Sequence, residues 1–254
     1  MWLLMLFAGL SAIGIVGCAS TPPREAQAKK KKDGPLHHYQ MARVHFEQGR
    51  IGEALKELDR SLEFDDSLPQ THFYLGYVRS ALEDWDQAEA AFREALRLNP
   101  YYTEARMYLA TCLVETGRAE EALAELDRAG RDRTYPSPEK VHFVRAMIYK
   151  DLGRFGDSLA ELRRAVTIKP QHYRAHFEMA QVLLEMDRKE EALAAFEAAR
   201  MGYAGDAGFF YRYGAALFHA GKVIEAERAL ERTVQLAPGS ESAAMATDLL
   251  GMIR

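Results

Sequence analysis

Residues 69–100 read PQTHFYLGYVRSALEDWDQAEAAFREALRLNP, and this stretch decides the fold. Gly76 and Ala88 are small residues inside two stretches of helical pattern, with a polar break between them. Small side chains allow two helices to approach closely, and Pro100 cannot continue a helix because its nitrogen carries no hydrogen. The stretch therefore predicts a helix-turn-helix unit that ends at Pro100.

The same pattern occurs six times along the chain at a nearly fixed period. Successive units are 34, 34, 36, 34 and 34 residues apart, and the two-residue excess falls around residues 131–138. A fixed period of this length is typical of solenoids, in which each unit packs on copies of itself. The units begin at Pro35, Pro69, Thr103, Glu139, Tyr173 and Ala207.

Equivalent positions of the six units, counted from the first residue of each, carry the same kind of residue. Position 15 is glycine in four units, which suits a left-handed helix end, and is Glu83 or Asp187 in the other two. Position 8 is always small: Ala42, Gly76, Ala110, Ala146, Ala180 and Gly214. Position 20 is also small: Ala54, Ala88, Ala122, Ser158, Ala192 and Ala226. Position 24 is large and apolar: Leu58, Phe92, Leu126, Leu162, Phe196 and Leu230.

This pattern resembles the tetratricopeptide repeat family, whose signature includes leucine and glycine at positions 7 and 8, as in Leu75 and Gly76. The resemblance covers residues 35–238. It implies an all-α fold, a right-handed α-solenoid of six tetratricopeptide-type helix pairs. Residues 239–254 then hold a C-terminal capping helix, from Ser240 to Met252, that covers the last apolar face.

The beginning of the chain differs in composition from the repeats. Residues 1–16 are uncharged and apolar, and Ile15-Val16-Gly17-Cys18 resembles the cleavage box of bacterial lipoprotein signal peptides. The resemblance implies a signal peptide over residues 1–17 and lipidation of Cys18, whose acyl chains would anchor the protein in a membrane. Residues 18–34 are expected to form a flexible tether. The alternative is a single transmembrane anchor over residues 1–19.

Composition and motifs exclude several classes of function. The formal charge is −4, and the run of lysines lies in the tether, so no basic patch for nucleic acid is expected on the folded body. The sequence contains no phosphate-binding glycine loop, HExxH motif, paired zinc cysteines or nucleophile elbow. We therefore expect no catalytic site, no metal and no cofactor.

Four histidines share position 4 of their units. Equivalent positions should lie roughly 10 Å apart, because neighbouring helices pack at about 8 to 10 Å, whereas nitrogen ligands lie about 2 Å from a shared metal ion. We expect these side chains to pack against the second helix, and Cys112 to be a buried small hydrophobic residue. The four are His38, His72, His142 and His176.

The first helices of this family line a concave groove, so the resemblance implies that positions 2, 5, 9 and 12 face a ligand. Position 5 is aromatic in five units and Met107 in the third, and position 9 adds a tyrosine. Such a stripe suits an apolar or amphipathic protein segment; the alternative is that the aromatics pack between units. The expected partner-binding residues are Tyr39, Phe73, Tyr77, Phe143, Phe177 and Tyr211.

The whole organisation resembles the outer-membrane lipoproteins of type IV pilus biogenesis, a group that includes a social-motility lipoprotein. Shared features are the insertion Thr134-Tyr135-Pro136 and the string Ala237-Pro238-Gly239-Ser240. The resemblance implies a non-catalytic scaffold, lipid-anchored in the outer membrane and facing the periplasm, that binds secretin subunits and promotes assembly of the secretin channel. Two alternatives stay open: a periplasmic adaptor for a cell-wall enzyme or protease, and a subunit for outer-membrane protein insertion.

Overall fold

The computed structural model describes residues 34–253, which form thirteen α-helices and one 3-10 helix, with no β-strand in that range. The predicted signal peptide, Cys18 and the tether up to residue 33 lie outside the described residues. None of the helices within residues 34–253 is long and apolar enough to cross a membrane. The chain divides into two compact units, with the boundary between Asp66 and Ser67.

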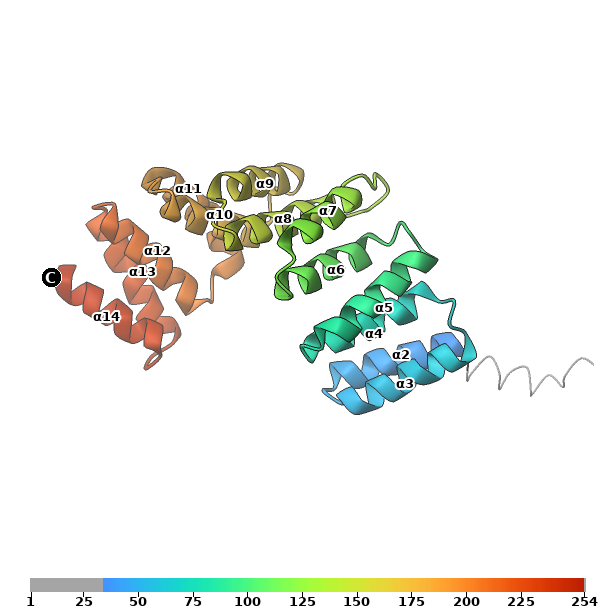
Figure 1. The fold of residues 1–254 in the computed structure, drawn as a ribbon. Coiled ribbons are helices and arrows are strands. Elements are labelled where there is room, and N and C mark those ends of the chain that lie inside the picture. The colour runs from blue at the N-terminus through green and yellow to red at the C-terminus, as the bar shows by residue number, and fades with distance from the viewer. Residues whose placement is uncertain (1–33, 254) are drawn as a thin grey trace, which may run out of the picture. The chain divides into compact units, whose positions relative to one another are not determined.

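Consecutive helices pack as pairs in both units (Figure 1). The first unit contains one pair, α2 (Pro35–Glu47) with α3 (Ile51–Phe64). The second unit contains five: α4 (Pro69–Ala81) with α5 (Trp85–Leu98), α6 (Thr103–Glu115) with α7 (Ala119–Ala129), α8 (Pro138–Asp151) with α9 (Phe155–Ile168), α10 (Tyr173–Glu185) with α11 (Lys189–Ala199), and α12 (Ala207–His219) with α13 (Val223–Leu236).

Two further elements complete the second unit. The 3-10 helix η1 (Arg200–Tyr203) follows α11, and α14 (Glu241–Ile253) packs on α13 and α12. The predicted fold class, six helix pairs and a C-terminal helix, is confirmed. Five of the six first helices begin at the predicted residue, and the other begins one residue earlier because Pro138 suits the first turn of a helix.

Each helix pair is held together by the same contact between a small and a large residue. The side chains at positions 20 and 24 are fully buried in all six units. A Cβ atom added at Gly76 would lie 2.7 Å from the ring of Phe92, and one added at Gly214 would lie 2.8 Å from Leu230. Position 8 is therefore small because the large residue at position 24 lies directly against the backbone there.

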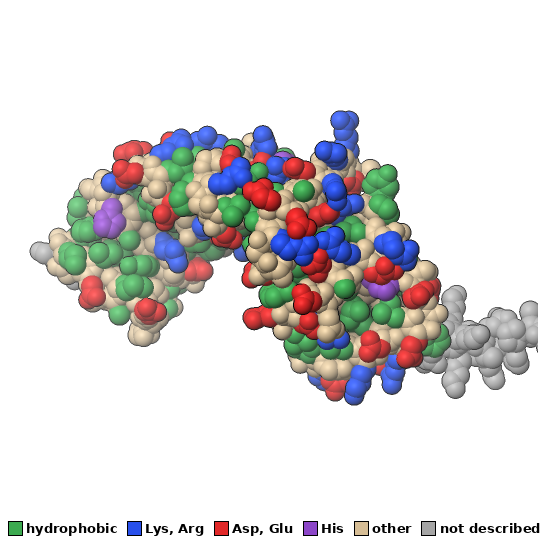
Figure 2. Space-filling model, in the orientation of Figure 1, with side chains coloured by type: hydrophobic (Ala, Val, Ile, Leu, Met, Phe, Trp, Pro, Cys, Tyr) green, Lys and Arg blue, Asp and Glu red, His purple; other side chains and the backbone are tan. Residues whose placement is uncertain are grey.

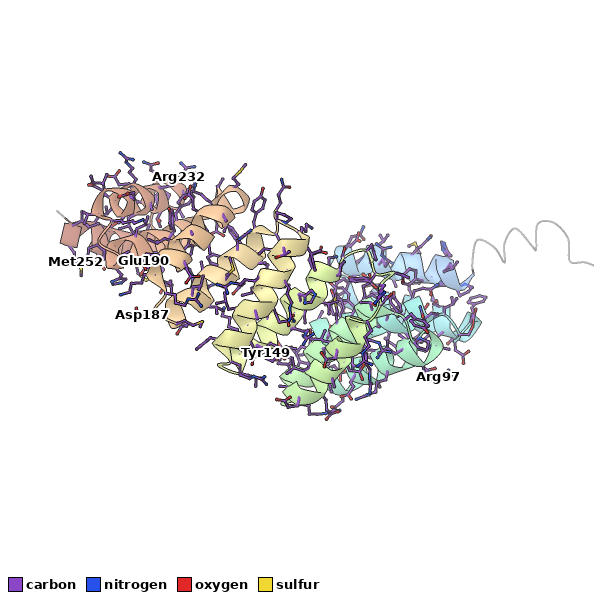
Figure 3. The ribbon with its side chains drawn as sticks, turned by 90° about the horizontal axis from the view of Figure 1, so that it is seen from above. Arg97, Tyr149, Asp187, Glu190, Arg232 and Met252 are labelled. Carbon is purple, nitrogen blue, oxygen red and sulfur yellow. The ribbon has the colours of Figure 1, made fainter. Side chains whose placement is uncertain are left out.

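The first helix of every pair ends in the left-handed conformation at position 15. The four glycines there have φ between 68° and 78°, as predicted, and Glu83 and Asp187 adopt the same conformation at 58° and 53°. In each unit the backbone N–H of the next residue donates to the carbonyl oxygen five residues earlier, as Arg118 N does to Leu113 O at 2.6 Å. The turn geometry therefore prevails over residue type at Glu83 and Asp187, the second of which is labelled in Figure 3.

Substitutions at these turns should change stability with opposite signs. We expect Asp187→Gly to raise the free energy of unfolding by about 0.5 to 1 kcal/mol, because glycine has no steric penalty at positive φ. Gly117→Ala should lower it by about 1 kcal/mol for the same reason. Gly156→Ala is the matched control: it lies inside α9 in open space without positive φ, so it should stabilise. Thermal unfolding followed by circular dichroism measures all three, and a stabilising Gly117→Ala would contradict this explanation.

Candidate functional site

All six predicted partner-binding side chains lie on first helices and are partly exposed. In the first compact unit, Tyr39 has the guanidinium carbon of Arg43 at 6.0 Å from its ring centroid. In the second unit the structure separates the other five into residues that pack between repeats and one residue that lines a groove.

Phe73 and Phe177 are mainly packing residues. The ring centroid of Phe73 lies 5.0 Å from that of Tyr102 and 5.5 Å from that of Tyr108. The ring of Phe177 lies at 5.0 Å from Tyr203 and at 5.7 Å from Phe209. Both rings therefore fill the junction with the following repeat, which favours the packing interpretation at these two positions.

Tyr77 and Phe143 also contact neighbours of the next repeat. The ring of Tyr77 meets that of Tyr108 edge-on, with centroids 5.3 Å apart. Phe143 stacks on His172 at 5.1 Å, and the guanidinium carbon of Arg174 lies 5.1 Å from its centroid. Burial and the charge of Lys169 lower the pKa of His172, so this ring is neutral at pH 7 and stacks as an aromatic.

Tyr211 lines an apolar groove of about 420 Å³ between α10 and α12. Leu184, 36% exposed, and Ala215 line the groove from the first helices, and Phe196 contributes from α11. Tyr211 also packs against the cluster of Leu230, Ala246 and Leu250, which holds it in place. The remaining lining residues are Gln181, Lys189, Arg212, Ala216 and His219.

The rim of this groove carries polar groups that are connected along the first helices. Arg212 Nη1 donates to Gln181 Oε1 at 3.3 Å, and Gln181 Nε2 donates to Glu178 Oε2 at 3.2 Å. Lys150 Nζ donates to the same Glu178 oxygen at 2.7 Å. Arg212 forms no ion pair with a carboxylate in residues 34–253, so its charge is available at the rim.

Several groove residues were not predicted, although the spacing of residues in the sequence could have identified some of them. Tyr211, Ala215 and His219 are four residues apart and so share one face of α12. Stepping by four from the predicted Tyr211 therefore finds the other two. Lys189 and Phe196 come from the second helix α11, which a rule restricted to first helices does not include.

Two of the position 4 histidines pair with a glutamate on the second helix, as expected, whereas His176 Nε2 lies 2.9 Å from the carbonyl oxygen of Pro170, outside its own second helix. His38 Nδ1 lies 2.6 Å from Glu57, and His142 Nδ1 lies 2.7 Å from Glu161. Arg106 occupies position 4 of the third unit and makes the equivalent pair with Glu125 at 2.6 Å. Within residues 34–253 no group of three or more His, Cys, Asp or Glu side chains is placed to hold a metal ion.

Glu161 is the most buried of these carboxylates, with a side chain 5% exposed. Burial opposes its ionisation, but the hydrogen bond with His142 and the charges of Arg145 and Arg164 outweigh that effect and lower the pKa of Glu161. A carboxyl whose pKa is lower in the folded state contributes stability above its unfolded pKa and loses it as the pH falls. The helix pair α8–α9 is therefore stabilised at neutral pH by the interactions of the ionised Glu161 carboxylate.

We expect Glu161→Gln to flatten the acid-induced loss of stability. In the wild-type protein the midpoint of unfolding should fall steeply as the pH drops below about 5, and the variant should lose part of that slope. Urea unfolding at a series of pH values checks this. Glu190→Gln on α11 is the control, because Glu190 is exposed and has no ion pair with a described residue (Figure 3). Equal slopes in wild-type and Glu161→Gln protein would show that the pair does not contribute.

Cys112 is buried at 0% exposure in the core around α6 and α7. Burial raises the pKa of its thiol to about 11, so the nucleophilic thiolate is absent at neutral pH. The structure thus agrees with the prediction of a buried hydrophobic residue.

Sequence models of the tetratricopeptide repeat match residues 35–60, 80–134 and 150–207, which together make up more than half of the chain. The chain belongs to the tetratricopeptide repeat proteins. Proteins of this family bind protein partners and are typically non-catalytic. This tetratricopeptide repeat protein is therefore a candidate interaction scaffold.

Curated relatives share the repeat over only part of their length. The chain is 26% identical over 196 residues to the TPR repeat-containing protein YpiA of Bacillus subtilis, covering 76% of this chain and 45% of YpiA. It is 25% identical over 150 residues to anaphase-promoting complex subunit 3 of Schizosaccharomyces pombe, covering 59% of this chain and 22% of the subunit. The chain thus spans less than half of either relative.

Solved structures with the same fold include PilW and PilF. PilW, a widely conserved type IV pilus biogenesis factor, matches with a TM-score of 0.76 at 20% identity over 84% of this chain and 98% of PilW. PilF of Pseudomonas aeruginosa matches with a TM-score of 0.73 at 18% identity over 86% of this chain and 97% of PilF. A chain of the hetero-tetramer Cut9–Hcn1 matches with a TM-score of 0.68 at 14% identity, over 90% of this chain and 44% of that one.

Proposed function

We propose that this protein is a non-catalytic outer-membrane lipoprotein that binds secretin subunits and promotes assembly of the type IV pilus secretin channel. The observation that carries the proposal is the fold match to PilW and PilF, which covers nearly the whole of both proteins. The lipoprotein-like box ending at Cys18 supports placement at a membrane. Many adaptor proteins share this fold, so the proposal depends on the fold match together with the lipoprotein-like box.

The groove between α10 and α12 is the part of the surface that suits the partner. Its volume of about 420 Å³ lies within the usual range of ligand pockets, about 300 to 1,000 Å³. Leu184 and Tyr211 offer apolar contacts to an amphipathic segment, and Arg212 at the rim offers a charged donor to a carboxylate or carbonyl group. Binding is stoichiometric in this proposal, and the acyl chains on Cys18 hold the groove near the site of channel insertion.

Co-purification from detergent-solubilised membranes tests the partner directly. The tagged full-length protein should retain the secretin in amounts comparable to its own. Recovery of a cell-wall enzyme or protease without secretin would support the periplasmic adaptor instead. A general loss of outer-membrane barrel proteins on depletion would favour the insertion subunit. Either result would contradict the proposal.

A further inference from the structure

Four arginines stand out because they have no polar or aromatic partner among residues 34–253. The other arginines in this range each contact a carboxylate, an amide or an aromatic ring, as Arg118 does with Glu89 and Arg174 with Phe143. The four exceptions form two close pairs in the sequence, and each pair lines a separate cavity. They are Arg131 and Arg133 in the loop between α7 and α8, and Arg228 and Arg232 on α13.

The cavity with Arg131 and Arg133 is a pocket of about 710 Å³ beside the beginning of α6. Arg106 and Arg128 also line it, so four arginines surround one cavity, and we call it the arginine pocket. Figure 2 shows Lys and Arg side chains gathered over α6, α7 and the loop that follows. Its remaining lining residues are Pro100, Tyr101, Thr103, Asp132 and Thr134.

The two carboxylates at the arginine pocket, Glu125 and Asp132, offset half of the charge of its four arginines, which leaves a net positive charge. Glu125 pairs with Arg106 at 2.6 Å and with Arg128 at 2.5 Å, so one carboxylate serves two arginines. Asp132, the acidic residue that lines the pocket, instead accepts hydrogen bonds from Thr103 Oγ1 at 2.7 Å and from Thr134 N at 2.9 Å. Arg131 and Arg133 therefore have no carboxylate partner.

The loop that carries these two arginines is held in place. Tyr135 lies two residues after Arg133 and is only 8% exposed, packed in the core with Val141 and Met107. The hydrogen bonds of Asp132 fix the loop at its other side. Because the backbone is fixed, binding an anion here costs less ordering entropy than it would on a free loop.

We propose that the arginine pocket binds an acidic segment of a partner protein that carries two or more carboxylates. Guanidinium groups bind carboxylates through paired N–H donors, and several arginines can engage several carboxylates at once. The volume far exceeds what one phosphate ion fills, which favours a peptide segment. Tyr101, 80% exposed at the edge, adds an aromatic surface of the kind that is frequent in protein interfaces. This inference is independent of the secretin proposal, because the pocket shares no residue with the apolar groove.

The test uses the full-length protein and a fluorescein-labelled hexaglutamate peptide, with binding followed by fluorescence anisotropy at about 0.1 M salt. We expect Arg131→Ala/Arg133→Ala to weaken binding about fivefold or more, since each exposed pair contributes modestly. Arg228→Ala/Arg232→Ala is the matched control. It removes the same charge from the other unpaired arginines, whose cavity also contains Glu197 and Glu225, and it should bind nearly as the wild type does.

Several outcomes would overturn the proposal. Equal losses in both double variants would mean non-specific attraction of the peptide to exposed arginines. Unchanged affinity in Arg131→Ala/Arg133→Ala would place the peptide elsewhere, for example on the lysines at residues 29–32. Displacement of the peptide by inorganic phosphate at constant ionic strength would assign the pocket to a phosphate group. Absence of any binding to the wild-type protein would exclude an acidic ligand.

Discussion

Phe92→Ala is expected to lower the free energy of unfolding by about 3 to 5 kcal/mol, among the largest effects of any single substitution here. The Phe92 ring is fully buried in the α4–α5 pair and lies against Phe73 and Tyr108, each with its centroid 5.8 Å away. Removing it leaves a cavity between two helices whose collapse is limited, because both also pack on α6. Urea unfolding followed by circular dichroism measures the loss.

A second substitution in the same helix pair tests the contact between residues 76 and 92 from the other side. Gly76→Ala should cost about 1 to 3 kcal/mol, because the new methyl group would meet the Phe92 ring. Gly76→Ala/Phe92→Leu recreates the alanine and leucine combination that the third and fourth units have. Its loss of unfolding free energy should therefore be smaller than the sum of the losses in the single variants Gly76→Ala and Phe92→Leu. Strict additivity, or a neutral Gly76→Ala, would contradict the proposed contact.

Tyr211→Ala/Leu184→Asp is expected to weaken binding of the secretin subunit by about 30-fold or more, which corresponds to about 2 kcal/mol. The change removes the aromatic ring of the groove and places a charge on its apolar wall. Binding of the purified full-length protein to the periplasmic part of the secretin, measured by calorimetry, gives the ratio of dissociation constants.

The control is Leu152→Asp, which introduces the same charge at an exposed leucine after α8 that does not line the groove. It should bind as the wild type does. Phe177→Ala is a poorer test, because Phe177 packs against Tyr203 and Phe209 and its loss would first lower stability. If the groove variant folds and binds with wild-type affinity, the partner binds elsewhere.

The fold follows from the sequence because its central contact is local and repeated. The small residue at position 8 and the large residue at position 24 lie on the two helices of one pair, so their meeting does not depend on distant parts of the chain. The left-handed turns at Glu83 and Asp187 show the same dominance of the repeat geometry over a single unfavourable residue.

The candidate site was predicted only in part because it depends on contacts between repeats. Position 5 looks equivalent in every unit, yet Phe73 and Phe177 are covered by Tyr102 and Tyr203, which lie between the helix pairs. Tyr211 packs against Leu230 and Leu250 and still borders the groove. Segments between helix pairs do not follow the repeat pattern, so the period alone cannot distinguish these cases.

The pairing of positions 4 and 23 was detectable in the sequence. Units with glutamate at position 23 have a cationic or ionisable partner at position 4, namely His38, Arg106 and His142. The other three units have alanine at position 23. A separation of 19 residues places these side chains face to face across the pair, so the coincidence of residue types predicts the contact.

Secretin multimers in the membranes of cells that lack this protein provide the most direct test of the proposed function. Gel electrophoresis without boiling separates multimers from monomers. We expect the multimers to disappear while the monomer persists, and we expect the wild-type protein, but not Tyr211→Ala/Leu184→Asp, to restore them. Multimers at wild-type levels in the cells lacking this protein would contradict the proposed role in secretin assembly.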